Sequence, residues 1–194
     1  GNAQAPTLIL IHGGRDHARS WDQVAHALRD DWHIICPDLR GHGDSAWSPD
    51  GAYTMPYFIC DLAQLIHQQG EAPVTIVAHS LGGAISLRYT GLYPEHVRKL
   101  VAIEGLGLPS AATGMGVERP FNTLWRDWIE ERRSLAARQP RRYASIEQAL
   151  ARMLAENSHL TEAQARHLTV HGVARNEDGS FSWKFDNYVR SGPP

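Results

Sequence analysis

Residues 74–83 have the sequence VTIVAHSLGG, and this stretch decides the fold. Its first five residues are almost continuously apolar, as expected for a strand that is covered on both faces of a parallel sheet. Ser80 follows with small residues two positions away on each side, and a helical pattern begins at once. A turn this sharp between a strand and a helix strains the backbone and exposes the serine hydroxyl above the sheet. The alternative is a serine that only caps the helix.

Similar apolar runs recur on both sides of this stretch. They predict strands over residues 7–11, 33–36, 74–78 and 100–103, with helical spacing of apolar residues near 21–28, 59–66 and 81–93. Strands that alternate with helices are typical of a parallel sheet with helices on both faces. The sequence therefore predicts an α/β fold for the first hundred residues.

The amino-acid composition and the pattern of apolar residues change at Gly105. Residues 105–116 are rich in glycine, proline and small side chains, and helical segments follow at about 121–137, 145–156 and 161–170. A polar turn at 176–179 and an aromatic run at 181–185 come next, with no further buried-strand pattern. We therefore predict two parts, a sheet-containing core over 1–104 and a helical cap over 105–194.

Composition and charge exclude several classes of function. The 194 residues include 19 Lys and Arg against 21 Asp and Glu, so nothing suggests a nucleic-acid partner. The apolar runs are far shorter than the roughly 18 residues of a membrane span. Two cysteines form no disulfide framework and favour a cytoplasmic location. No spaced zinc motif and no complete G-x-G-x-x-G occur, so neither a metal nor a cofactor is predicted.

Three turns after predicted strands together resemble the α/β-hydrolase family. They are HGGRD at 12–16, PDLRGHGDS at 37–45 and AHSLGG at 78–83, in the order that the family has them. The resemblance covers residues 7–104, with Ala78 where glycine is commonest. It implies that Ser80 is the nucleophile and that the backbone N–H groups of Gly14 and Leu81 form the oxyanion hole.

A serine nucleophile also needs a histidine base and a carboxylate that orients it. Glu104 ends the strand after the nucleophile helix, and one branch of the family, which includes haloalkane dehalogenases, carries its acid there. The rival, Asp38, belongs to the D-x-R-G loop, where the family uses it to orient backbone. The family's histidine follows a later strand, and no histidine here fits that role: His12 belongs to the oxyanion turn and His79 points away from Ser80. We therefore expect an incomplete core, corresponding to the family's strands three to six, that lacks the histidine loop and has almost no turnover alone.

The cap region sets substrate choice in this family. Trp125 and Trp128 share one apolar helix face, which packs on the core or lines the pocket. With His12, Arg15 and His79 they are the candidate pocket residues. The sequence predicts a serine hydrolase that cleaves a carboxylic ester or related acyl compound through an acyl-enzyme, on a small-molecule substrate with an apolar acyl or aromatic portion. The alternative is a non-catalytic ligand-binding or scaffold protein that kept the turn without the triad.

Overall fold

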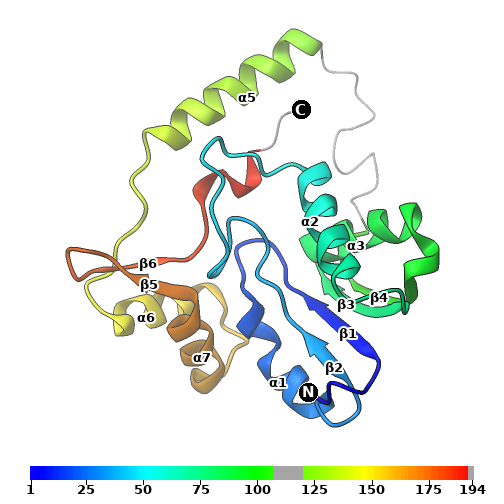
Figure 1. The fold of residues 1–194 in the computed structure, drawn as a ribbon. Helices are drawn as coiled ribbons and strands as arrows, with labels where there is room; N and C mark the ends of the chain where they lie inside the picture. Colours follow the sequence, from blue (N-terminus) through cyan, green and yellow to red (C-terminus); the bar gives the residue numbers. More distant parts are fainter. Residues whose placement is uncertain (107–119, 192–194) are drawn as a thin grey trace.

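The computed structural model describes residues 1–106 and 120–191. Four parallel strands form one sheet in the order β2-β1-β3-β4, as Figure 1 shows at the lower right. Each strand lies where the apolar runs predicted it, and β4 begins three residues earlier than expected. The strands are β1 (Thr7–Ile11), β2 (His33–Ile35), β3 (Val74–His79) and β4 (Val97–Ile103).

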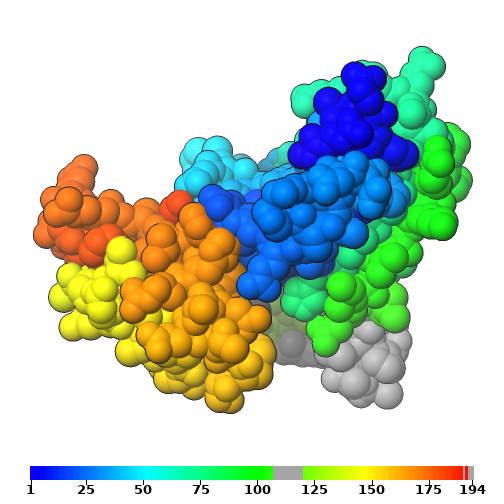
Figure 2. Space-filling model, turned by 90° about the horizontal axis from the view of Figure 1, so that it is seen from below, coloured from blue at the N-terminus to red at the C-terminus, as the bar shows by residue number. Residues whose placement is uncertain are grey.

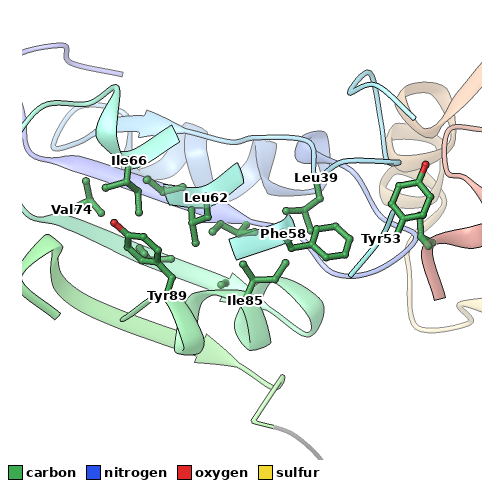
Figure 3. Packing of buried hydrophobic residues seen from close by; sticks show 13 residues of the cluster. Leu39, Tyr53, Phe58, Leu62, Ile66, Val74, Ile85 and Tyr89 are labelled. Carbon is green, nitrogen blue, oxygen red and sulfur yellow. The ribbon is translucent and has the colours of Figure 1, made fainter. Parts of the chain in front are cut away.

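Helices cover both faces of this sheet because successive side chains of a strand point to opposite sides. Leu8 and Leu10 of β1 pack with Trp21 on one face. Ile9 and Ile11 join the larger cluster on the other face, where Figure 3 shows side chains such as Phe58, Leu62 and Tyr89 packed together. The first face carries η1 (Ala18–Trp21) and α1 (Asp22–Leu28), and the second carries α2 (Met55–His67) and α3 (Leu81–Leu92), after which comes η2 (Pro94–His96).

The second part of the chain contains helices at all three predicted segments. It also contains a two-stranded antiparallel hairpin that the sequence pattern did not reveal. Each hairpin strand has three residues, too few for a recognisable alternation, and the turn between them closes where Asn176 N–H donates to the Ser180 carbonyl at 2.7 Å. The elements are α5 (Phe121–Ala136), α6 (Ile146–Glu156), α7 (Glu162–Gly172), β5 (Val173–Arg175), β6 (Phe181–Trp183) and η3 (Asn187–Arg190).

Residues 184–189 return to the sheet-containing part. Gly43 N–H donates to the Lys184 carbonyl at 2.7 Å, and Asp186 N–H donates to the Gly41 carbonyl at 2.9 Å. The buried Tyr53 hydroxyl donates to the Asp186 carboxylate at 2.7 Å, and Val189 lies in the larger core cluster. The boundary at residue 104 stays a prediction, but the two parts are joined by these buried contacts.

The β4 edge of the sheet exposes apolar side chains. Val101 is 51% exposed and Ile103 is 47% exposed, although both lie on a strand that pairs with β3. Among the described residues β4 is an edge strand, and an exposed apolar edge is a template for further strand pairing. Within the described ranges, no helix is long and apolar enough to cross a membrane.

The Tyr53–Asp186 contact predicts a measurable loss of stability. Tyr53→Phe removes the donor to a buried carboxylate and also the acceptor of the Ser48 N–H. We expect the free energy of unfolding to fall by about 1–3 kcal/mol, the cost of leaving buried polar groups unpaired. Urea unfolding measures it. Tyr57→Phe, at an exposed tyrosine, is the matched control; an equal loss in both variants would contradict the role given to Tyr53.

Candidate functional site

Ser80 occupies a strained turn between β3 and α3. Its backbone has φ 50° and ψ −112°, a conformation that costs a non-glycine residue about 1–3 kcal/mol and persists only where surrounding contacts impose it. Those contacts are backbone hydrogen bonds: Ser80 N–H donates to the Ile103 carbonyl at 2.9 Å, and Ala84 N–H donates to the Ser80 carbonyl at 3.0 Å. The structure therefore has a sharp, strained turn at Ser80, and its role as the turn of a nucleophile stays a prediction.

Backbone strain at the carboxyl edge of the sheet is not confined to Ser80. In the described part of the chain, the non-glycine residues with positive φ are Arg15 (63°), Ser80 (50°) and Glu104 (65°). They lie in the turns that follow β1, β3 and β4, three neighbouring strands. Each of the three was singled out from the sequence as a candidate site residue. Strain of this kind gathers at functional sites.

Glycines let these turns approach one another backbone to backbone. A Cβ on Gly82 would lie 2.7 Å from the His12 carbonyl oxygen, and one on Gly83 would lie 2.7 Å from the Glu104 carbonyl oxygen. A Cβ on Gly105 would fall 2.1 Å from the Ser80 carbonyl oxygen. Real Cβ atoms do not approach backbone this closely, so these positions exclude any other residue unless the backbone moves.

The two predicted oxyanion-hole residues are neighbours in space. A Cβ on Gly14 would lie 3.8 Å from Cδ2 of Leu81, so the turn after β1 reaches the start of α3. Neither residue's N–H donates a hydrogen bond to another residue that the structure describes. Leu81 is the first residue of α3, where unpaired N–H groups and the helix dipole favour negative charge. The arrangement can bind an anion.

His12 lies inside the turn after β1 and not on a cleft wall. It is fully buried; its Nδ1–H donates to the Gly13 carbonyl at 2.7 Å, and its Nε2 accepts from the Leu39 N–H at 3.0 Å. Burial lowers the pKa of His12 from 6.5 to about 4. This neutral ring connects the turn after β1 to the loop after β2, so it shapes the site and has no surface to offer a substrate.

Asp38 connects loops by accepting hydrogen bonds from backbone. Its carboxylate accepts from Ala18 N–H at 2.6 Å and from Asp44 N–H at 2.9 Å, while its own carbonyl accepts from the Ser45 hydroxyl at 2.7 Å. A Cβ on Gly43 would collide with this carboxylate. These contacts agree with the expected orienting role of Asp38.

Glu104 approaches the turn between β3 and α3 through its backbone, and its side chain extends toward His79. The Glu104 carboxylate is 77% exposed and lies 3.9 Å from Nε2 of the 44% exposed His79. The His79 ring lies against Gly13, where a Cβ would be 2.8 Å from the ring Nδ1. Across residues 1–106 and 120–191, the Ser80 hydroxyl has no hydrogen-bond partner. The structure thus brings a serine, two N–H groups and a carboxylate to one edge of the sheet, and no histidine among the described residues bonds the serine.

A cleft of about 480 Å³ lies between the turn after β1 and the cap region. Arg15 and Asp16 form its wall on the core side, and Tyr143, Trp183 and Phe185 are among its residues on the cap side. Of the predicted pocket residues, Arg15 lines this cleft. The aromatic run at 181–185 was visible in the sequence and contributes Trp183 and Phe185 to the cleft. Its pattern did not indicate that these residues would lie near Arg15.

Trp125 and Trp128 lie elsewhere. Both belong to α5, which Figure 1 shows running across the top of the molecule, beyond η3 and away from the sheet. Trp128 Nε1–H donates to the Ser191 carbonyl at 3.1 Å, and its ring packs edge-on against Trp125. In this structure Trp128 contacts Ser191, Trp125 contacts Trp128, and neither tryptophan lines the cleft.

Comparisons with known proteins agree with this architecture. A family model described as alpha/beta hydrolase fold matches residues 6–189. A serine hydrolase-like protein of Danio rerio is 27% identical over 190 residues, 96% of this chain and 56% of that protein. Esterase Rv0045c of Mycobacterium tuberculosis is 27% identical over 183 residues, 94% of this chain and 57% of its own length.

Solved structures give the same picture. The structure of esterase Rv0045c has a TM-score of 0.74 at 26% identity, over 96% of this chain and 60% of that one. Protein PA1622 of Pseudomonas aeruginosa has a TM-score of 0.80 at 22% identity, over 100% of this chain and 66% of that one, a likeness of fold alone. The chain thus spans little more than half the length of the two curated relatives.

The buried position of His12 predicts how stability depends on pH. Because its pKa is about 4 in the folded chain and 6.5 when unperturbed, only the unfolded chain binds a proton at this ring between those values. Folding stability should be greatest above pH 6.5 and fall as the pH falls toward 4. His42, whose pKa burial also lowers, adds to the same slope. Thermal unfolding across this window measures it.

The ring itself supplies the sharper test. Long-range ¹H–¹⁵N NMR in the middle of that window should show His12 as the neutral Nδ1–H tautomer, and the same residue should titrate normally in urea. An imidazolium signal for His12 in the folded chain would contradict the assigned hydrogen bonds.

Proposed function

The chain belongs to the alpha/beta hydrolase fold family, and on this premise we propose that it is a serine hydrolase that cleaves a carboxylic ester or related acyl compound. The observation that carries the proposal is the coincidence of backbone strain at Arg15, Ser80 and Glu104 with the three sheet-edge turns. A chain that kept the fold for packing alone has no need to hold three non-glycine residues in this conformation. The relatives named serine hydrolase-like protein and esterase support the same reading.

The chemistry follows from the positions of the groups. In the proposed reaction, the Ser80 oxygen attacks the acyl carbon, its proton passes to a base, and the carbonyl oxygen becomes an oxyanion. The N–H groups of Gly14 and Leu81 stabilise this charge, and each such donor is typically worth about 10²- to 10³-fold in rate. The leaving alcohol departs protonated, and water then releases the acid from the acyl-enzyme.

Glu104 is our candidate for the acid that orients the base. Its backbone packs against α3 through Gly83 and Gly105, so the carboxylate is held at the same sheet edge as Ser80. Its exposed position beside His79 leaves room for another imidazole to approach. We place the base outside the 194 residues, because no ring among the described histidines bonds Ser80 and residues 107–119 and 192–194 contain no histidine. The chain alone should then be nearly inactive.

The cleft beside Arg15 supports a substrate with an apolar or aromatic portion, as its wall carries Tyr143, Trp183 and Phe185. The charged residues around the cleft also favour a substrate with a negative charge, which the near-neutral charge of the whole chain does not indicate. Of the charged residues around the cleft, Arg152 pairs with Glu156 and Lys184 pairs with Asp44. The other charged lining residues are Arg15, Arg138 and Arg141 against Asp16. We infer an acyl substrate that also carries an anionic group. Both cysteines are free, which supports the proposed cytoplasmic location.

A non-catalytic binding protein is the second candidate. The observation that favours it is that no described residue contacts the Ser80 hydroxyl as a base, since a protein that only binds needs the cleft and the N–H groups but no proton acceptor. The two candidates differ in whether Ser80 becomes acylated when a base is supplied.

Chemical rescue separates the candidates. The chain is incubated with an activated aryl ester, with and without free imidazole, and acyl-serine is located by peptide mass mapping. We expect slow acylation at Ser80 that imidazole accelerates, and none at this position in Ser80→Ala. Ser134→Ala, which changes an exposed serine on α5, is the control and should behave as the parent chain does.

Each result decides a part of the proposal. Acylation no faster at Ser80 than at surface serines, with imidazole present, would favour the binding protein. Rapid ester turnover by the chain without imidazole, abolished in Ser80→Ala, would keep the nucleophile but overturn the placement of the base outside these residues.

A further inference from the structure

Helix α7 of the cap region packs against η1 of the sheet-containing part and contacts Asp22 at the start of α1. Figure 1 places the orange α7 beside the blue α1, and Figure 2 shows the same two segments in contact from below. Two histidines bridge the junction: His17 Nε2 lies 3.0 Å from the Leu168 carbonyl oxygen, and His167 Nε2 lies 3.1 Å from the Arg19 carbonyl oxygen. Imidazole nitrogens thus concentrate where the two parts meet.

Three metal-binding side chains converge at this junction. His167 and His171 are four residues apart on α7 and so share one helix face, with ring centroids 4.6 Å apart. Asp22, the first residue of α1, places its carboxylate oxygen 3.1 Å from His167 Nε2. One ligand atom from each of the three residues lies within 4.8 Å of the others, and all three side chains are half-buried.

We propose that Asp22, His167 and His171 form a binding site for a divalent transition metal ion such as Zn²⁺. Two imidazole nitrogens and one carboxylate oxygen are a ligand set that suits zinc, cobalt and nickel better than magnesium or calcium, which prefer oxygen alone. Zinc bonds of about 2.0–2.1 Å in a tetrahedral site put ligand atoms about 3.3 Å apart. The Asp22–His167 pair already has this spacing. On metal binding, His167 Nε2 would give up its contact with the Arg19 carbonyl oxygen, and a His171 nitrogen would move closer from its present position within 4.8 Å.

Without a metal, Arg19 supplies the positive charge at the site. Its Nε and Nη2 both lie 2.7 Å from the Asp22 carboxylate oxygen that faces His167. The Arg19 side chain is 53% exposed, so it can leave the carboxylate and extend into solvent. Exposed ion pairs of this kind are weak. Arg19 therefore competes with the metal ion for Asp22, and its removal should strengthen metal binding.

A metal held here connects the two parts of the chain. Asp22 comes from the sheet-containing part, whereas both histidines come from the cap region. The ion would bind the folded chain and not the unfolded one, so it should raise the unfolding temperature and fix α7 against α1. The sequence showed no zinc motif because the carboxylate comes from a distant segment, and only the fold brings it to the i, i+4 histidine pair.

Metal titration of the chain without an affinity tag tests the proposal. Calorimetry with Zn²⁺ gives stoichiometry and affinity, and the visible absorption of Co²⁺ reports tetrahedral coordination. We expect one ion per chain. His171→Gln and Asp22→Asn should each weaken binding by more than about 10-fold, since even indirect partners of a metal site are worth that much. Arg19→Gln should tighten it.

His159→Gln, which changes an exposed histidine in the loop before α7, is the matched control and should bind as the parent chain does. Circular dichroism of each variant without metal checks that it is folded. If one of His171→Gln, Asp22→Asn and Arg19→Gln misfolds, the other two still test the proposal. Absence of binding by the parent chain would overturn the proposal, and so would equal affinity in the parent chain and His171→Gln. These readouts do not involve ester cleavage, so they stand apart from the test of Ser80.

Discussion

The close approach of three turns at the carboxyl edge of the sheet is the constraint on which the site depends. The turns after β1, β3 and β4 touch through backbone atoms, because Gly82, Gly83 and Gly105 carry no Cβ to separate them. The same contacts hold Ser80 and Glu104 at positive φ, and the energy of that strain is met by the buried strands on which the turns are mounted. The proposed nucleophile Ser80, the proposed oxyanion donors and the Glu104 carboxylate therefore lie in turns that contact one another, so a short sequence motif can specify their arrangement in space.

Much of the core was predictable from sequence, for local reasons. The apolar runs that become β1 and β3 are continuous because both faces of the sheet are covered, and a small residue on each side of Ser80 is required by the strand-turn-helix geometry. The positions of Ser80, Gly14 and Leu81 follow from these short patterns. Their adjacency in space follows from the parallel order of the strands, which puts all carboxyl ends at one edge.

What the sequence could not provide depends on contacts between distant segments. His12 was a candidate pocket residue, but its buried ring accepts a hydrogen bond from the Leu39 N–H in the loop after β2. The sequence near His12 gives no sign of this distant partner. Trp125 and Trp128 lie on an apolar helix face, but an apolar pattern does not predict which surface the face contacts. In the structure the Trp128 indole N–H donates to the Ser191 carbonyl. The β5–β6 hairpin is too short to show a period, and its place is fixed by the Tyr143–Phe181 pairing with the loop before α6.

A crystal structure of the chain with an alkyl boronic acid would test directly whether the turns after β1, β3 and β4 form a catalytic site. Boronic acids add to an exposed serine and mimic the tetrahedral intermediate. We expect a tetrahedral boronate on the Ser80 oxygen, with one boron-bound oxygen about 2.7–3.1 Å from both the Gly14 and the Leu81 nitrogen atoms, and with the Ser80 backbone still at positive φ. A boronate bound elsewhere, or one on Ser80 whose oxygens contact neither nitrogen, would contradict the proposal that these three turns form a catalytic site.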